Sequence, residues 1–173
     1  MEEKITNKKE ALEKLKQSGW NLHYVSNQLK CDIDVIKIAI VSEPEAIKSC
    51  PNHILQNKEL ILILLKEQPL IFEYLDDKLR DNYSIVMTAV RADGYLFSFA
   101  SERLRGNKQI VLEAMKTSLD TLDFASKEIK EIVGSDDNFM IENVKKSISN
   151  EKFARKLNNE LTPSNQPRNK VKI

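Results

Sequence analysis

The chain of 173 residues is poor in the residue types on which catalytic and metal sites depend. It has two histidines, two cysteines and four glycines. His23 and His53 are far apart, and no HxxxH or CxxC spacing of a metal site is present. The scarcity of glycine leaves no glycine-rich loop to hold a phosphate group. We therefore expect no enzyme, no cofactor, no metal and no small-molecule substrate.

Long apolar runs and a strong net charge are also lacking. The longest apolar run, Leu60 to Leu65, is six residues, whereas a membrane-spanning helix needs roughly 18 or more. We expect no membrane span, and two cysteines suit a reducing compartment such as the cytoplasm. The net charge of +1 argues against general nucleic-acid binding. Residues 32–81 carry a net negative charge. These charges fit a surface that only contacts solvent, or alternatively an acidic patch that binds a basic partner.

What the chain does contain is a repeat of 25 residues. An Asn or Asp recurs at this interval in five copies, at Asn7, Asp32, Asn57, Asn82 and Asn107. The repeats are 7–31, 32–56, 57–81, 82–106 and 107–131. A fixed period over several copies is typical of a repeat protein.

Apolar residues recur at five positions of each repeat, and none of these positions holds a charge in any copy. The first two positions hold Ala11, Ile36, Ile61, Val86, Val111, and Leu15, Ile40, Leu65, Val90, Met115. The other three hold Leu22, Ile47, Phe72, Phe97, Leu122, then Val25, Cys50, Leu75, Ala100, Ala125, and Leu29, Ile54, Leu79, Leu104, Ile129. Spacings of three, four and seven predict one buried helical face.

The repeated Asn or Asp predicts the N-cap of a first helix of about eleven residues, such as Lys58 to Gln68. Gly or Pro ends this helix in four of the five copies. A short second helix follows, and then a kink or one extra turn; a continuous second helix is the alternative. Helices this short are marginal alone, so each repeat must pack on the next.

These patterns predict an all-α fold, an α-solenoid of five 25-residue helical-hairpin repeats with a C-terminal capping helix. The single domain would span residues 1–161, with the cap at 132–161. Residues 162–173 are rich in Asn, Pro and basic residues, which predicts a disordered tail.

The segments Asn107 to Lys116, Phe124 to Lys130 and Phe99 to Arg105 resemble the family called domain of unknown function 4116. The resemblance covers residues 7 to about 131 and is weakest in the second repeat, which has Pro44 and Pro51. It implies tandem helical units of about fifty residues, often in secreted effectors of Legionella-like bacteria. No activity and no site residue come with the family.

Our candidate for partner binding is one position of the repeat that is polar in some copies and apolar in others. It follows the end of the first helix by one residue and holds Trp20, Glu45, Leu70, Tyr95 and Asp120. Because no common structural demand unites these residues, we expect the position to be exposed and free to vary. Large aromatic side chains often anchor interfaces.

Two rival interpretations concern other residues. An aromatic position nearby holds Tyr24, Ser49, Tyr74, Phe99 and Phe124, and its four aromatic residues fit a core position better. Cys50 and His53 have the spacing of a nucleophile and a base, but Cys50 occupies a core position, and Cys31 has no evident role. A disulfide between the two cysteines is not expected.

The sequence thus favours a protein–protein interaction scaffold. If the family resemblance extends to function, the scaffold would be a bacterial effector that binds a host protein in the host cytoplasm. The alternative is a nucleic-acid-binding helical repeat, and an enzyme with an unrecognised site is more remote.

Overall fold

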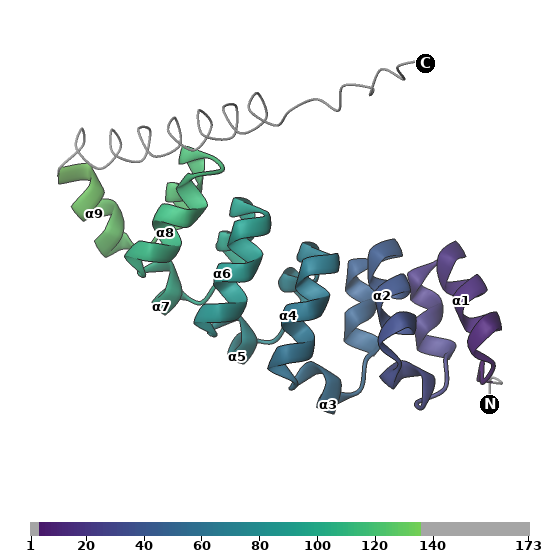
Figure 1. The fold of residues 1–173 in the computed structure, drawn as a ribbon. Helices are drawn as coiled ribbons and strands as arrows, with labels where there is room; N and C mark the ends of the chain where they lie inside the picture. Colours follow the sequence, from purple (N-terminus) through teal and green to yellow (C-terminus); the bar gives the residue numbers. More distant parts are fainter. Residues whose placement is uncertain (1–3, 136–173) are drawn as a thin grey trace, which may run out of the picture.

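The computed structural model describes residues 4–135, which form a curved row of helices (Figure 1). Five long helices lie side by side in this row: α1 (Lys8–Gln17), α2 (Ile33–Ser42), α4 (Lys58–Glu67), α6 (Tyr83–Ala92) and α8 (Lys108–Met115). The described residues form no β-strand, only an isolated bridge between Ile5 and Val25. The predicted all-α repeat architecture is confirmed.

Each long helix begins directly after the repeated Asn or Asp. In every copy the side-chain oxygen of this residue accepts a hydrogen bond from an amide of the first turn, over 3.0–3.1 Å. The bond satisfies one of the amides that a helix start leaves without a partner. The five predicted N-caps are therefore confirmed.

The second segment of each repeat is a 3-10 helix of six residues rather than an α-helix. These segments are η1 (Gly19–Tyr24), η3 (Pro44–Ser49), η4 (Pro69–Tyr74), η5 (Gly94–Phe99) and η6 (Leu119–Phe124). Four of them begin at the Gly or Pro that was expected to end the first helix, and η6 begins at Leu119. A tight 3-10 turn suits so short a connection between packed elements.

A third segment follows a break that begins with an extended residue, so each repeat has three segments rather than two. The extended residues have ψ of 146–157° and are Val25, Cys50, Leu75, Ala100 and Ala125. The third segments are η2 (Leu29–Cys31), α3 (Asn52–Leu55), α5 (Asp77–Arg80), α7 (Glu102–Arg105) and α9 (Lys127–Ser135).

The break before the third segment has a chemical cause. Its first residue caps the new turn: Asp76 accepts from the Leu79 amide at 2.9 Å, and Ser101 from the Leu104 amide at 3.2 Å. Pro51 holds the same place in the second repeat and disfavours a helical conformation of the residue before it. The predicted kink and extra turn are confirmed, and the alternative of a continuous second helix is wrong.

The predicted C-terminal cap is only partly within the described residues. Helix α9 runs from the fifth repeat to Ser135, into the predicted cap of 132–161. The rest of that cap and the predicted tail of 162–173 lie outside the described residues.

The five repeated apolar positions form most of the core, and neighbouring residues such as Val35, Leu64 and Ile85 complete it. The side chains at the five positions are buried in every repeat, except that Leu29 and Leu122 are only partly buried. Phe72 and Phe97 are the largest fully buried side chains. Removing a buried Leu, Ile or Phe side chain from such a core costs about 2–5 kcal/mol, so the repeat pattern is explained by packing.

Neighbouring repeats pack along their whole length. Each long helix contacts the next, and the 3-10 helices form a second layer of neighbours. The short helices α3, α5 and α7 lie along the convex edge of the row in Figure 1. The last turns of the long helices and the first residues of the 3-10 helices therefore lie along the opposite, concave edge.

Candidate binding surface

The five candidate residues form one row on the concave edge, which we call the anchor row: Trp20, Glu45, Leu70, Tyr95 and Asp120. Each is the second residue of its 3-10 helix. Trp20 is 49% exposed, Leu70 44% and Tyr95 48%, and Asp120 is also exposed, whereas Glu45 is half-buried. Because the 3-10 helices of successive repeats are in contact, these side chains lie in register along the layer.

Local hydrogen bonds fix the backbone of the anchor row. The Tyr95 amide donates to the Asp93 carboxylate over 2.9 Å, and the Asp120 amide donates to Ser118 Oγ over 3.2 Å. The Leu70 amide donates to Gln68 Oε1 over 3.4 Å. The row is thus held on a rigid backbone before any partner arrives, which lowers the entropy lost on binding.

The rival aromatic position is largely structural. Tyr74, Phe99 and Phe124 are partly buried and pack against the core. Lys48 places its Nζ 4.9 Å from the centroid of the Tyr74 ring, a cation–π contact between successive repeats. Tyr24 differs, because it is 43% exposed and meets the His23 ring edge-on. The core interpretation holds for three of these aromatics and fails for Tyr24.

A second row of residues, which the sequence pattern above does not include, lies beside the anchor row. Four residues before each anchor residue, the last turn of the long helices holds Lys16, Val41, Lys66, Arg91 and Lys116. We call it the basic row. Cations near a helix C-terminus interact favourably with its dipole, which explains the four basic residues but not Val41. Its signal in the sequence is a Lys or Arg that recurs at the repeat interval in four of the five repeats.

Val41 lines a hollow between α1 and α2. The cavity has a volume of about 400 Å³ and is lined by Lys16, Lys37, Ile38, Val41 and Ser42. Val41 is 58% exposed. The Gly19 amide donates to Ser42 Oγ over 3.2 Å, which ties the wall of the hollow to the residue that precedes Trp20. Basic row, hollow and anchor row therefore meet at the junction of the first two repeats.

The cysteines do not form the nucleophile–base pair considered above. Cys50 is buried, and burial raises the pKa of its thiol to about 12. His53 lies instead against Cys31, with 3.4 Å between Nε2 and Sγ. Both cysteines are free thiols, in agreement with the expectation of no disulfide.

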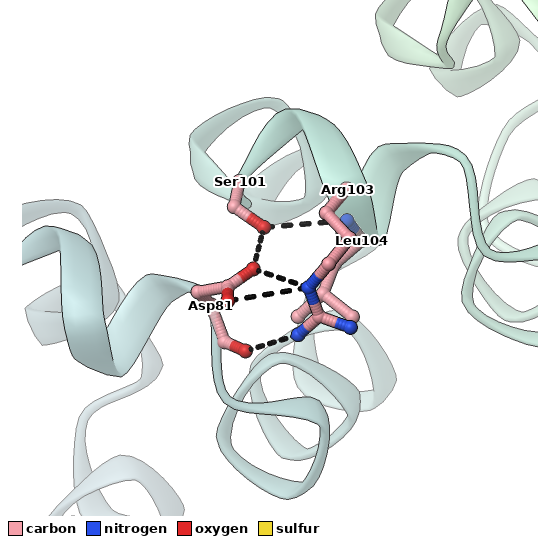
Figure 2. A network of polar contacts seen from close by, with 4 residues as sticks. All are labelled: Asp81, Ser101, Arg103 and Leu104. Atoms are coloured by element: carbon pink, nitrogen blue, oxygen red, sulfur yellow. Dashed lines mark hydrogen bonds and ion pairs between the residues drawn. The ribbon is translucent and has the colours of Figure 1, made fainter.

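The Cys31–His53 contact belongs to a repeated joint on the convex edge. At the same positions of the third and fourth repeats, Asp81 accepts hydrogen bonds from Arg103 Nε and from Ser101 Oγ (Figure 2). Ser101 Oγ in turn accepts from the Leu104 amide. The two hydrogen bonds lower the pKa of the Asp81 carboxyl, with Ser101 the larger cause. We interpret both contacts as links between repeats.

Within residues 4–135, no three His, Cys, Asp or Glu side chains gather closely enough to hold a metal ion. None of the helices in this range is long and apolar enough to span a membrane. These observations define the chain as an all-α helical-repeat protein with an exposed, mixed apolar and basic edge.

A family model described as domain of unknown function (DUF4116) matches residues 7–56, 34–80, 57–105 and 82–130. The chain therefore belongs to this family. Three of the four matches begin at a repeated N-cap, Asn7, Asn57 or Asn82, and each spans about two of the 25-residue repeats. No curated protein and no solved structure matched the chain.

Proposed function

We propose that the chain is a protein–protein interaction scaffold that binds its partner along the anchor row. One observation carries the proposal: three large apolar or aromatic side chains, Trp20, Leu70 and Tyr95, are exposed at the same position of their repeats. Exposed side chains of this kind that cluster on a rigid surface are typical interface anchors. Glu45 and Asp120 would contribute polar contacts at the same row.

The proposal assigns no catalytic role to the chain. Cys31 has a histidine neighbour, but the same two positions of the third and fourth repeats hold the ion pair between Asp81 and Arg103. The other thiol, Cys50, is buried. The family resemblance extends the proposal to a bacterial effector, whose partner would be a host protein and whose site of action would be the host cytoplasm. Otherwise the scaffold would act in the bacterial cytoplasm.

Nucleic-acid binding is the second candidate, and the basic row favours it. Basic side chains interleaved with aromatic ones can follow a single strand. The row is interrupted, however, because Val41 replaces a cation and Glu45 and Asp120 would repel phosphates. Protein binding requires no such regularity, so we prefer it.

The experiment is affinity capture from eukaryotic and bacterial lysates, with and without nuclease, read by mass spectrometry. The baits are the wild-type chain and the double variant Trp20→Ala/Tyr95→Ala, with Tyr83→Ala as control. Tyr83 is 40% exposed but lies on α6, outside the anchor row. We expect a protein whose capture survives nuclease treatment. The wild-type chain and the Tyr83→Ala control should capture it, and the double variant should not.

Because about half of the Trp20 and Tyr95 side chains is buried, each substitution should lower the free energy of unfolding by about 1–2 kcal/mol and leave the chain folded. A double variant that unfolds would show that these residues are structural and contradict the site. Loss of all captured protein after nuclease treatment would favour the nucleic-acid candidate. A bacterial partner alone would remove the effector role and leave the scaffold.

A further inference from the structure

The hollow between α1 and α2 has an unusual combination of walls. Ile38 and Val41 provide apolar surface, whereas Lys16 and Lys37 stand beside them. Among the described lining residues there is no carboxylate. A cavity of about 400 Å³ lies within the range of sites that bury small groups, and it can take a bulky aliphatic or aromatic side chain.

The charge beside the hollow is only partly neutralised by the residues that the structure describes. Lys37 Nζ lies 2.7 Å from Glu67 Oε1 on α4, so this cation already has a partner. Lys16 is exposed and makes no ion pair among residues 4–135. An anionic group placed at the rim would therefore meet one unpaired cation and one shared cation.

From this arrangement we propose that the hollow is the specificity pocket of the scaffold. It takes an apolar side chain of the partner protein whose flanking residues are Asp or Glu. The inference rests on the proposed function, because the same partner would contact the neighbouring anchor row at Trp20. It adds the chemical class of the bound segment, which the anchor row alone does not define.

Two features favour an acidic protein segment over other occupants. The apolar walls match a side chain rather than a phosphate backbone, and the two lysines match the carboxylates beside it. Complementary charge at a rim mainly increases association and selects against wrong partners. An anionic lipid surface would contact a broad apolar face, whereas the apolar part of this hollow, as far as residues 4–135 form it, consists of Ile38 and Val41.

The test begins with a phage-displayed library of random twelve-residue peptides panned on the full chain. We expect enriched sequences with a Leu, Ile, Phe or Trp and an Asp or Glu within two positions of it. Synthetic versions should shift the NMR signals of the amides in residues 37–42. Enriched sequences without acidic residues would overturn the proposal.

Three variants locate the binding. Val41→Asp places a carboxylate in the hollow, and Lys16→Glu reverses the unpaired charge; each should weaken peptide binding at least tenfold. Ile63→Asp is the matched control, because Ile63 is 43% exposed on α4 but does not line the hollow. Circular dichroism and thermal unfolding verify that each variant is folded. If Val41→Asp does not fold, the Lys16→Glu variant still tests the proposal.

Other outcomes separate this inference from the proposed function. Peptides that bind the Val41→Asp and Lys16→Glu variants as tightly as wild type, but do not bind the Trp20→Ala/Tyr95→Ala variant, would contradict the pocket. The proposed scaffold function would then still stand. No enrichment above background would also overturn the pocket, whereas the scaffold is judged by lysate capture. The chain could instead bind phosphatidylserine vesicles or single-stranded RNA, lose that binding in Val41→Asp, and bind no peptide. This result would contradict the proposal that the partner is an acidic protein segment.

Discussion

At the residue scale, the two cysteines differ in what surrounds the sulfur. Cys31 is exposed next to His53, whereas Cys50 is buried and its thiol has a pKa raised to about 12. A thiol must ionise to react as a nucleophile, so Cys50 should stay protonated and unreactive at pH 8. Titration of the native chain with a thiol reagent should modify Cys31 rapidly and Cys50 only after denaturant is added.

The Cys31→Ser variant provides the control for that titration, because it should show almost no reaction until the chain unfolds. Rapid modification of two thiols in the native wild-type chain would contradict the buried position of Cys50.

A second residue-scale prediction concerns the Asp81 joint. Hydrogen bonds from Ser101 and Arg103 hold the pKa of the Asp81 carboxyl below its usual value, which is about 3.9 in an unfolded chain. The ionised carboxylate therefore stabilises the fold above pH 4, and this contribution is lost as the pH falls through the lowered pKa. Asp81→Asn should be less stable than wild type at pH 7.

Urea denaturation at several pH values measures this difference. The gap between wild type and Asp81→Asn should narrow steadily below pH 4, because protonated Asp81 resembles Asn. Asp77→Asn is the control, since the Asp77 side chain is 97% exposed and its ion pair with Arg80 should contribute little to stability. A gap that stays constant down to pH 2 would show that the carboxylate charge does not stabilise the joint.

The N-caps and the core positions were predictable from the sequence because both follow from rules that act within one repeat. An Asn caps the helix that it precedes, and apolar spacing fixes one buried face. The contacts of Asp81 with Arg103 and of Cys31 with His53 were not predictable. They depend on how one repeat is rotated on the next, which no local spacing encodes.

At the element scale, glycine permits the close approach of a 3-10 helix to the following long helix. A Cβ at Gly94 would lie 2.7 Å from the Ala114 carbonyl oxygen and 2.5 Å from Thr117 Oγ1. Both distances are well inside ordinary contact, and the carbonyl belongs to a helix backbone. Gly94→Ala should therefore destabilise the fold by about 1–3 kcal/mol through overpacking.

Gly106→Ala is the matched comparison for Gly94→Ala. A Cβ at Gly106 would come no closer than 3.2 Å to any neighbour, here Ser126 Oγ. Its free energy of unfolding should change by no more than about 0.5 kcal/mol. Chemical denaturation of both variants gives the comparison, and equal stabilities would contradict the tight packing at Gly94.

The type of the second segment was not fully predictable. Gly19, Pro44, Pro69 and Gly94 correctly indicated the end of four of the five long helices. The same residues begin the 3-10 helices, and helical spacing over six residues cannot distinguish the two helix types. The extra turn that was expected is the third segment, and boundary residues such as Ser101 and Asp76 indicate it because their side chains cap a new turn.

At the scale of the whole molecule, the structure is a row in which each repeat is held by its neighbours. Ion pairs join successive repeats, such as Lys8 with Asp32 over 2.7 Å and Lys37 with Glu67 over 2.7 Å. Exposed pairs of this kind contribute about 0–1 kcal/mol each, so the shared core supplies most of the cohesion. The row leaves two edges, and the anchor row occupies one of them.

The sequence predicted which position of the repeat is exposed, but not the shape of the surface around it. Variation at Trp20, Leu70 and Tyr95 indicated exposure, and the structure confirms that these three are exposed. The hollow at Val41 could not be foreseen, because it is shaped by two helices from different repeats. Whether these residues bind a partner stays a prediction.

The most direct test of the central claim is amide hydrogen exchange of the chain alone and in complex with the protein that it captures. Our account predicts new protection in residues 18–24, 68–74 and 93–99, where the anchor row lies, and none in α3, α5 or α7. Protection confined to these three short helices, with the anchor row unchanged, would place the partner on the convex edge and contradict the account.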